Sequence, residues 1–203
     1  MSRESGIGGG VLAMAGKKCL AMASDKRYGW SYQMTTDTFH KIFQINNKCL
    51  FGASGLYTDI QTVFEKSRYN ANMYRLREGK EINGRQFANS TAHLLYSNRF
   101  ASFQIGSMAC GLDENDDPVI CSYDGIGAPE FSNVGVCGRC SSELMGMADT
   151  FYRDNMEPEE LVNTIGQCFL AACGRNAFSG FGLEIFLLTK DELKILNYRP
   201  QQD

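Results

Sequence analysis

The chain of 203 residues is 43% hydrophobic and 21% charged, with a formal net charge of −3. This length and composition predict one globular domain over residues 1–203, and the acidic balance argues against a nucleic-acid partner. No apolar run reaches the roughly 20 residues of a membrane-spanning helix, and the first residues lack the apolar centre of a signal peptide. We therefore expect neither membrane insertion nor secretion.

The eight cysteines lie mostly in apolar runs, which favours free, buried thiols over disulfides.

The first half of the chain predicts strands followed by helices. Apolar runs flank short polar turns, which is the pattern of antiparallel hairpins. Apolar residues then recur at helical spacing, and Gly79 marks a helix end. We expect strands over 10–15, 19–24, 41–46 and 48–53, then helices over 56–77 and 85–100.

The second half repeats this order. Ser141 is a good residue to begin a helix, and Pro158 with acidic neighbours suits the first turn of another. We expect strands over 107–112, 118–123 and 134–137, helices over 141–153 and 157–173, and strands over 182–189 and 193–198.

The helices are expected in consecutive pairs and do not alternate with strands. This order disfavours a parallel sheet built from strand–helix–strand units. Two antiparallel sheets stacked face to face, each covered by one helix pair, would bury every apolar face. The sequence therefore predicts the α+β class, as a four-layer αββα sandwich.

Polar residues stand at the ends of these apolar runs. Asp25 ends the run 19–24, Lys41 opens the next, and 174–180 reads Gly-Arg-Asn-Ala-Phe-Ser-Gly. This order and spacing resembles the beta subunits of the 20S proteasome, over nearly the whole chain. The resemblance implies the N-terminal nucleophile hydrolase fold, which is the same four-layer sandwich. The nucleophile of that family is a threonine exposed at the mature N-terminus.

N-terminal nucleophile chemistry needs a hydroxyl that attacks a carbonyl and a free α-amine on the same residue that acts as its base. By resemblance, Asp25 and Lys41 match the acid and the lysine beside the nucleophile. Gly55 matches the glycine whose N–H stabilises the oxyanion. The threonine position itself is occupied by Gly9, which has no side chain.

Two further departures accompany the missing nucleophile. The pair Gly8-Gly9 lacks the Gly–Thr bond at which active members cleave their propeptide, so residues 1–8 should remain as a short unprocessed extension. Asn176 stands where the active pattern has an aspartate, while Ser179 keeps the serine. We therefore expect no catalytic residue, and we expect Asp25 and Lys41 to form a structural ion pair.

The resemblance implies a non-catalytic structural subunit of the 20S core particle, acting in ubiquitin-dependent protein degradation. Its partners would be other beta and alpha subunits in a 28-subunit barrel of stacked heptamers, with the regulatory particle contacted indirectly. The expected location is cytoplasmic and nuclear. No cofactor is expected.

One aromatic segment comprises Tyr28, Trp30, Tyr32 and Phe39, together with Met34. This segment is either a subunit interface or ordinary core.

Other chemistries compete with this interpretation. Cys137 and Cys140 form a C-x-x-C motif before a predicted helix, as in dithiol oxidoreductases. A zinc site is disfavoured, because neither of the two histidines, His40 and His93, has a close-spaced second ligand. An alternative nucleophile at Ser2 or Ser5 would precede the strand that must present it.

Overall fold

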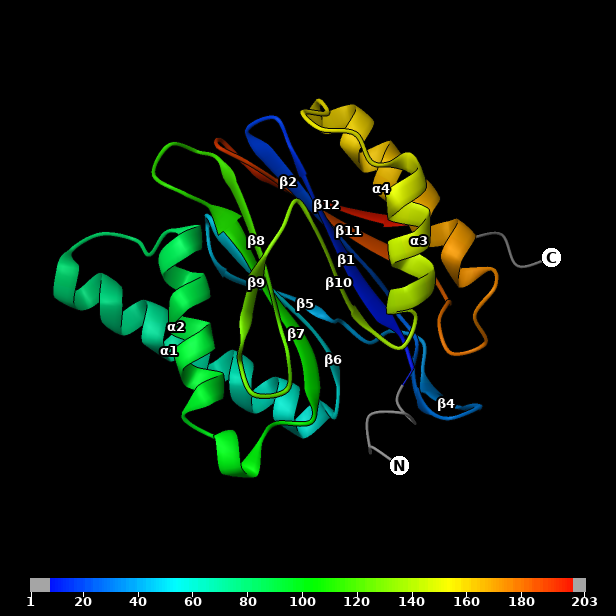
Figure 1. The fold of residues 1–203 in the computed structure, drawn as a ribbon, viewed down its shortest axis with the longest axis horizontal. Coiled ribbons are helices and arrows are strands. Elements are labelled where there is room, and N and C mark those ends of the chain that lie inside the picture. The colour runs from blue at the N-terminus through cyan, green and yellow to red at the C-terminus, as the bar shows by residue number, and fades with distance from the viewer. Residues whose placement is uncertain (1–7, 199–203) are drawn as a thin grey trace.

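The computed structural model describes residues 8–198 and shows two stacked sheets between two helix pairs (Figure 1). All recorded strand pairs within the two sheets are antiparallel. The first sheet consists, in spatial order, of β10 (Val134–Gly138), β1 (Gly10–Gly16), β2 (Cys19–Asp25), β11 (Leu183–Thr189) and β12 (Leu193–Tyr198). The second consists of β5 (Ile42–Asn46), β6 (Cys49–Gly55), β7 (Ile105–Leu112), β8 (Pro118–Tyr123) and β9 (Pro129–Phe131).

The helices cover the outer faces of the sheets. One pair packs on β5, β6, β7 and β8 of the second sheet, and the other packs on β10, β1, β2 and β11 of the first. The helices are α1 (Tyr57–Glu78), α2 (Gly84–Tyr96), α3 (Ser141–Phe151) and α4 (Pro158–Cys173). The predicted four-layer αββα sandwich is confirmed.

Three apolar layers hold the sandwich together. One lies between the sheets, and the others lie between each sheet and its helices. Strand β1 contributes side chains to two of these apolar layers, because alternate side chains of a strand point to opposite faces of the sheet. Leu12 and Met14 face α3 and α4, whereas Val11 and Ala13 face the second sheet. All eight cysteines are free thiols and all except Cys173 are buried, as predicted.

The structure differs from the sequence prediction at three places. Helix α2 ends at Tyr96 and not at residue 100, because the Ser97 and Asn98 side chains both donate to the Leu94 carbonyl oxygen. A separate 3-10 turn, Arg99–Ala101, follows. A two-stranded hairpin of β3 (Tyr28–Trp30) and β4 (Gln33–Thr36) and the edge strand β9 were not predicted.

Within residues 8–198, no helix combines the length and the apolar character that crossing a membrane requires. The predicted extension 1–8 and the alternative nucleophiles Ser2 and Ser5 lie outside the described residues, apart from Gly8.

Candidate functional site

Asp25 and Lys41 meet at the end of the sandwich where β1 begins. Strand β2 ends at Asp25, and Lys41 directly precedes β5 of the other sheet. The Lys41 ammonium lies 2.9 Å from Asp25 Oδ1, 2.8 Å from the Asp25 carbonyl oxygen and 2.7 Å from that of Arg27. These three acceptors use all three ammonium protons. The side chains of Lys41 and Asp25 are 1% and 0% exposed, so the ion pair is fully buried.

The Asp25 carboxylate also accepts two backbone hydrogen bonds. Gly10 N–H donates to Oδ1 at 2.9 Å, and Gly180 N–H donates to Oδ2 at 3.2 Å. A buried charge is tolerated only when it is paired and hydrogen-bonded, and here both conditions are met. The carboxylate thus ties together the start of β1, the end of β2 and the turn before β11.

The space beside Gly9 is filled by this ion pair. A β-carbon at Gly9 would lie 2.5 Å from Lys41 Cε, 2.7 Å from Lys41 Nζ and 2.8 Å from Asp25 Oδ1. The φ angle of Gly9 is +98°, a backbone conformation that residues other than glycine rarely adopt. Lys41 therefore occupies the place that a side chain at position 9 would need.

Asn176 makes its side-chain hydrogen bonds away from the ion pair. Its Nδ2 donates to Glu143 Oε1 at 3.0 Å, and its Oδ1 accepts from Phe178 N–H at 2.8 Å. Glu143 lies in the first turn of α3, so a carboxylate at position 176 would face another carboxylate. Ser179 is buried, and its hydroxyl has no hydrogen-bond partner among the described residues.

Gly55 is required by the backbone. It ends β6 with a φ of +139°, and a β-carbon there would lie 2.4 Å from the Gln104 carbonyl oxygen. The positive φ angle and the nearby Gln104 carbonyl oxygen are enough to require a glycine at position 55. No role of its N–H in stabilising an oxyanion is needed to explain this residue.

Arg27 belongs to the site and was missed by sequence reasoning. Its buried guanidinium donates to the carbonyl oxygens of Phe178 and Ser31, both at 3.0 Å. Its own carbonyl oxygen accepts from Lys41. Arg27 thus links the ion pair to the 176–180 turn, a contact between segments that no local sequence pattern indicates.

The C-x-x-C motif lacks the properties of a redox-active dithiol. Cys137 faces the core between the sheets, whereas Cys140 faces the core beneath α3 and α4. Burial raises the pKa of Cys137 to about 12 and raises the pKa of Cys140 further. Reactive cysteines need a lowered pKa and access to solvent, so the structure does not support the oxidoreductase hypothesis.

The histidines form no metal site with other described residues. His40 Nδ1 lies 2.9 Å from Glu184 Oε2, and His93 lies in the last turn of α2. Within the described part of the chain, no group of three or more His, Cys, Asp or Glu side chains is placed to hold a metal ion.

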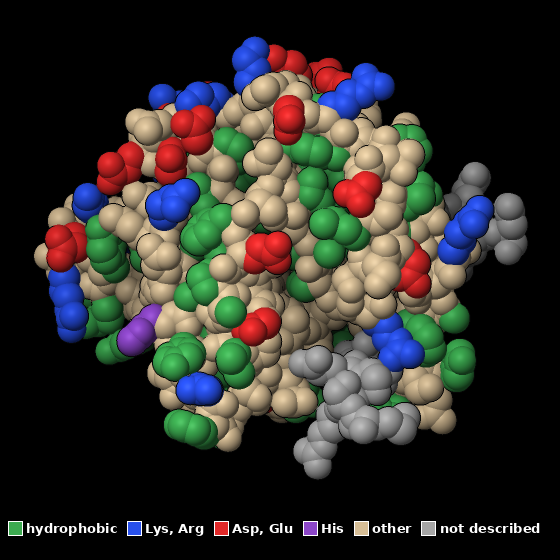
Figure 2. Space-filling model, in the orientation of Figure 1, with side chains coloured by type: hydrophobic (Ala, Val, Ile, Leu, Met, Phe, Trp, Pro, Cys, Tyr) green, Lys and Arg blue, Asp and Glu red, His purple; other side chains and the backbone are tan. Residues whose placement is uncertain are grey.

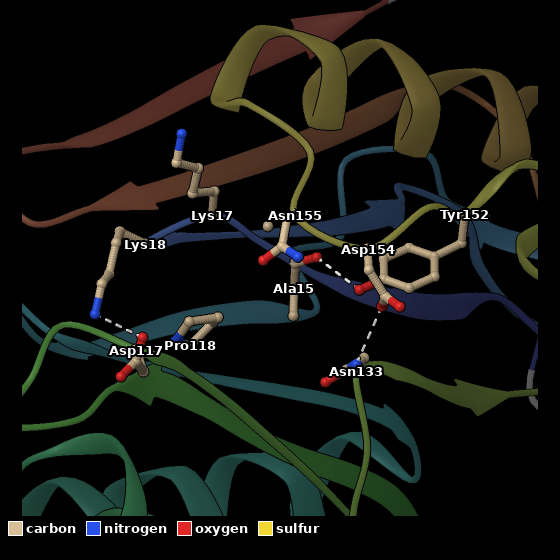
Figure 3. A pocket seen from close by; sticks show the side chains of 10 residues that line it. Ala15, Lys17, Lys18, Asp117, Pro118, Asn133, Tyr152, Asp154 and Asn155 are labelled. Carbon is tan, nitrogen blue, oxygen red and sulfur yellow. Dashed lines mark hydrogen bonds and ion pairs between the residues drawn. The ribbon is translucent and has the colours of Figure 1, made fainter.

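A polar cavity of about 350 Å³ opens at the opposite end of β1 (Figure 3). Its charged groups pair with one another or with neighbouring side chains. The contacts are Lys18 Nζ to Asp117 Oδ1 at 2.7 Å, the Tyr152 hydroxyl to the Ala15 carbonyl oxygen at 3.0 Å, and Asn133 Nδ2 to Asp154 Oδ1 at 3.4 Å.

The aromatic segment is divided between surface and core. Trp30, Tyr32 and Met34 are exposed on the β3–β4 hairpin. Tyr28 and Phe39 are half-buried, and their ring centroids are 4.6 Å apart. Only the hairpin part of this segment is free to serve as an interface.

Known proteins match this chain over most of its length. Residues 7–188 match the family described as "Proteasome subunit". A "Probable proteasome subunit beta type-3" of Schizosaccharomyces pombe is 38% identical over 186 residues, or 91% of each chain. The proteins named "Proteasome subunit beta type-3" of Oryza sativa and Dictyostelium discoideum are 38% and 35% identical, over 92% and 97% of each chain. The chain therefore belongs to the proteasome subunit family.

Proposed function

We propose that this chain is a non-catalytic structural subunit of the 20S core particle, of the beta type-3 kind. The observation that carries this proposal is the position of Lys41. Its amine and terminal methylene fill the volume beside Gly9 that a nucleophile's side chain would occupy. Covalent catalysis has no attacking group at that position and no room for one.

The residues of the former site have a structural role in this proposal. Lys41 donates hydrogen bonds to Asp25, at the end of β2 in the opposite sheet, and to Arg27 just after that strand, and so joins the two sheets at one end of the sandwich. Asp25 fixes the start of β1 through Gly10. The arrangement of an active centre would thereby be retained for rigidity, while neighbouring subunits carry out the cleavage.

Assembly supplies the biological role. The subunit would take one fixed place in a heptameric beta ring and occur twice in the 28-subunit barrel. It would lie between other beta subunits, with an alpha ring on one side and the second beta ring on the other. The regulatory particle would be contacted only indirectly. This role is proposed for the cytoplasm and the nucleus.

Purification through a C-terminal tag on this chain tests the proposal. The chain should co-purify with alpha and other beta subunits in a particle whose native mass fits 28 subunits with two tagged copies. The chain isolated alone should hydrolyse no fluorogenic peptide. Its intact mass should show that residues 1–8 remain attached. A stable monomer with peptidase activity, or a mature N-terminus at Gly9, would contradict the proposal.

A further inference from the structure

Glu184 is a buried acid of the first sheet whose partner is an exposed histidine. Its side chain is 5% exposed and lies between the two sheets, on the same face of β11 as Phe186 and Leu188. His40 Nδ1 lies 2.9 Å from Glu184 Oε2, and the His40 side chain is 62% exposed. No other ion pair within residues 8–198 includes Glu184. Among the described residues, His40 is therefore the group placed to offset the charge of this carboxylate.

The cations that lie near this pair in the chain are bound to other groups. Lys41 donates to Asp25, as described above. The guanidinium of Arg27 donates to two backbone carbonyl oxygens. Lys26 donates to the side-chain oxygen of Asn197 on β12. None of these three cations makes an ion pair with Glu184 in place of the histidine.

The residues beside Glu184 in the sheet are uncharged. Ser24 of β2 and Asn197 of β12 stand opposite Glu184 on the two neighbouring strands. In the second sheet, neither β5 nor β6 contains a charged residue. Asp37, three residues before His40, is exposed and makes no ion pair within the described part of the chain. The charge balance at the buried carboxylate thus depends on His40.

His40 ends the segment that carries the β3–β4 hairpin. Residues 26–40 leave the first sheet after β2 and lead to the second sheet, and we call them the hairpin segment. Phe39 N–H donates to the Lys26 carbonyl oxygen at 3.0 Å, which joins the two ends of this segment. Its exposed apolar side chains are Trp30, Tyr32 and Met34. Figure 2 shows hydrophobic side chains at the lower right of the molecule, where the hairpin lies in Figure 1.

Two successive residues join the end of the hairpin segment to neighbouring strands of the first sheet. Lys41 pairs with Asp25 of β2, and His40 pairs with Glu184 of β11. Histidine is the side chain that ordinarily gains and loses its proton between about pH 5 and pH 8. The contact of His40 is therefore built from a side-chain type whose charge changes near neutral pH.

We propose that His40 and Glu184 form a pH-dependent latch that holds the hairpin segment on the first sheet. With the imidazole protonated, the contact is a hydrogen bond between opposite charges, which is stronger than one with a neutral donor. With the imidazole neutral, the buried carboxylate has no cation beside it, so the segment opens more often. The latch is therefore strongest at about pH 6 and weakens as the pH rises to about 8. This inference does not depend on the proposed function.

Hydrogen exchange of the full-length chain, followed by mass spectrometry, tests the latch. Rates are measured at about pH 6 and about pH 8, and each is compared with the intrinsic rate at the same pH to give a protection factor. Protection of peptides from the hairpin segment should fall about fivefold between the two pH values. This is the scale by which a hydrogen bond to a charged group exceeds a neutral one. Peptides from β1 and β2 should keep their protection, because both strands are buried throughout.

Two substitutions remove the charge from either side of the contact. His40→Gln keeps a hydrogen-bonding side chain that cannot be protonated, so protection of the hairpin segment should equal the wild-type value of pH 8 at both pH values. Glu184→Gln removes the carboxylate and should abolish the same pH dependence. Because both changes act through one contact, the double variant should lose no more protection than His40→Gln alone.

The matched control is His93→Gln. His93 is the other histidine of the chain, lies exposed on α2 and makes no ion pair within residues 8–198. This variant should keep the pH dependence of the wild-type chain. A pH dependence lost in His40→Gln and kept in His93→Gln would support the latch.

Equal protection of the hairpin segment at both pH values in the wild-type chain would overturn the inference. So would a pH dependence that survives His40→Gln. Because His40 is exposed, this variant should fold, and its result stands even if Glu184→Gln does not fold. Incorporation into the particle is measured separately, so either outcome leaves the proposed function untouched.

Discussion

Replacing Lys41 with alanine should destabilise the fold strongly, because the change leaves the buried Asp25 carboxylate without its cation. The Asp25 side chain is 0% exposed, so bulk solvent does not replace the lost ammonium. The two remaining donors to the carboxylate are the N–H groups of Gly10 and Gly180. The carbonyl oxygens of Asp25 and Arg27 also lose their Lys41 hydrogen bonds.

Breaking a buried ion pair by removing one partner costs about 3–5 kcal/mol. Since every 1.4 kcal/mol is a factor of ten, the unfolding equilibrium constant should rise roughly 10²- to 10⁴-fold. For a chain of this length, 1 kcal/mol corresponds to about 2–4 °C, so the thermal midpoint should fall by about 6–20 °C.

Circular dichroism of the isolated chain measures the midpoint, and native gels measure incorporation into the particle. Lys17→Ala is the matched control, because Lys17 pairs with Glu157 and both side chains are more than 60% exposed. That control should leave the midpoint almost unchanged, since exposed ion pairs contribute little. Adding Asp25→Asn to Lys41→Ala should recover part of the lost stability, because it removes the stranded charge.

Peptidase activity per assembled particle should be the same with Lys41→Ala as with the wild-type chain. An unchanged midpoint for Lys41→Ala, equal to that of the Lys17→Ala control, would refute the reasoning from burial. Normal assembly with loss of one cleavage preference would instead show that this subunit catalyses.

Three further predictions follow from the same region. Gly9→Thr should create no peptidase activity and should lower stability by about 1–3 kcal/mol, because its side chain would collide with Lys41; appreciable hydrolysis by this single variant would contradict that. Asn176→Asp should lower stability by about 1 kcal/mol or less through repulsion from Glu143, and denaturant titration should show the loss shrinking at high salt. Cys137 should resist thiol reagents at pH 8 until the chain is unfolded, because burial raises its pKa to about 12. The stability that this buried neutral thiol contributes is complete below pH 9 and should decline as pH rises from about 9 to 12.

Much of the fold could be predicted because its strands are apolar runs with turn residues between them. Strands β1 and β2 are buried along their whole length, so their signal in the sequence is strong. Strand β9 gave no such signal, because all of its residues, Pro129–Phe131, are exposed. The end of α2 was misplaced because Ser97 and Asn98 compete for a helix carbonyl oxygen, an effect that apolar periodicity does not contain.

The candidate site could be predicted only in part. Asp25 and Lys41 stand at the ends of apolar runs, so an ion pair between them could be expected, and the structure contains it. The contacts of Arg27 with Phe178 and of Asn176 with Glu143 join segments far apart in the sequence. Such contacts depend on how the helices and turns pack over the sheet end, so they could not be read from the local sequence.

The most direct test of the central claim is the intact mass of this chain after its particle is treated with an electrophile that traps N-terminal nucleophiles. Catalytic beta subunits in the same sample should gain the mass of the adduct, while this chain keeps its unmodified mass. An adduct on this chain, with stoichiometry matching that on the catalytic subunits, would contradict the proposal that this chain carries no nucleophile.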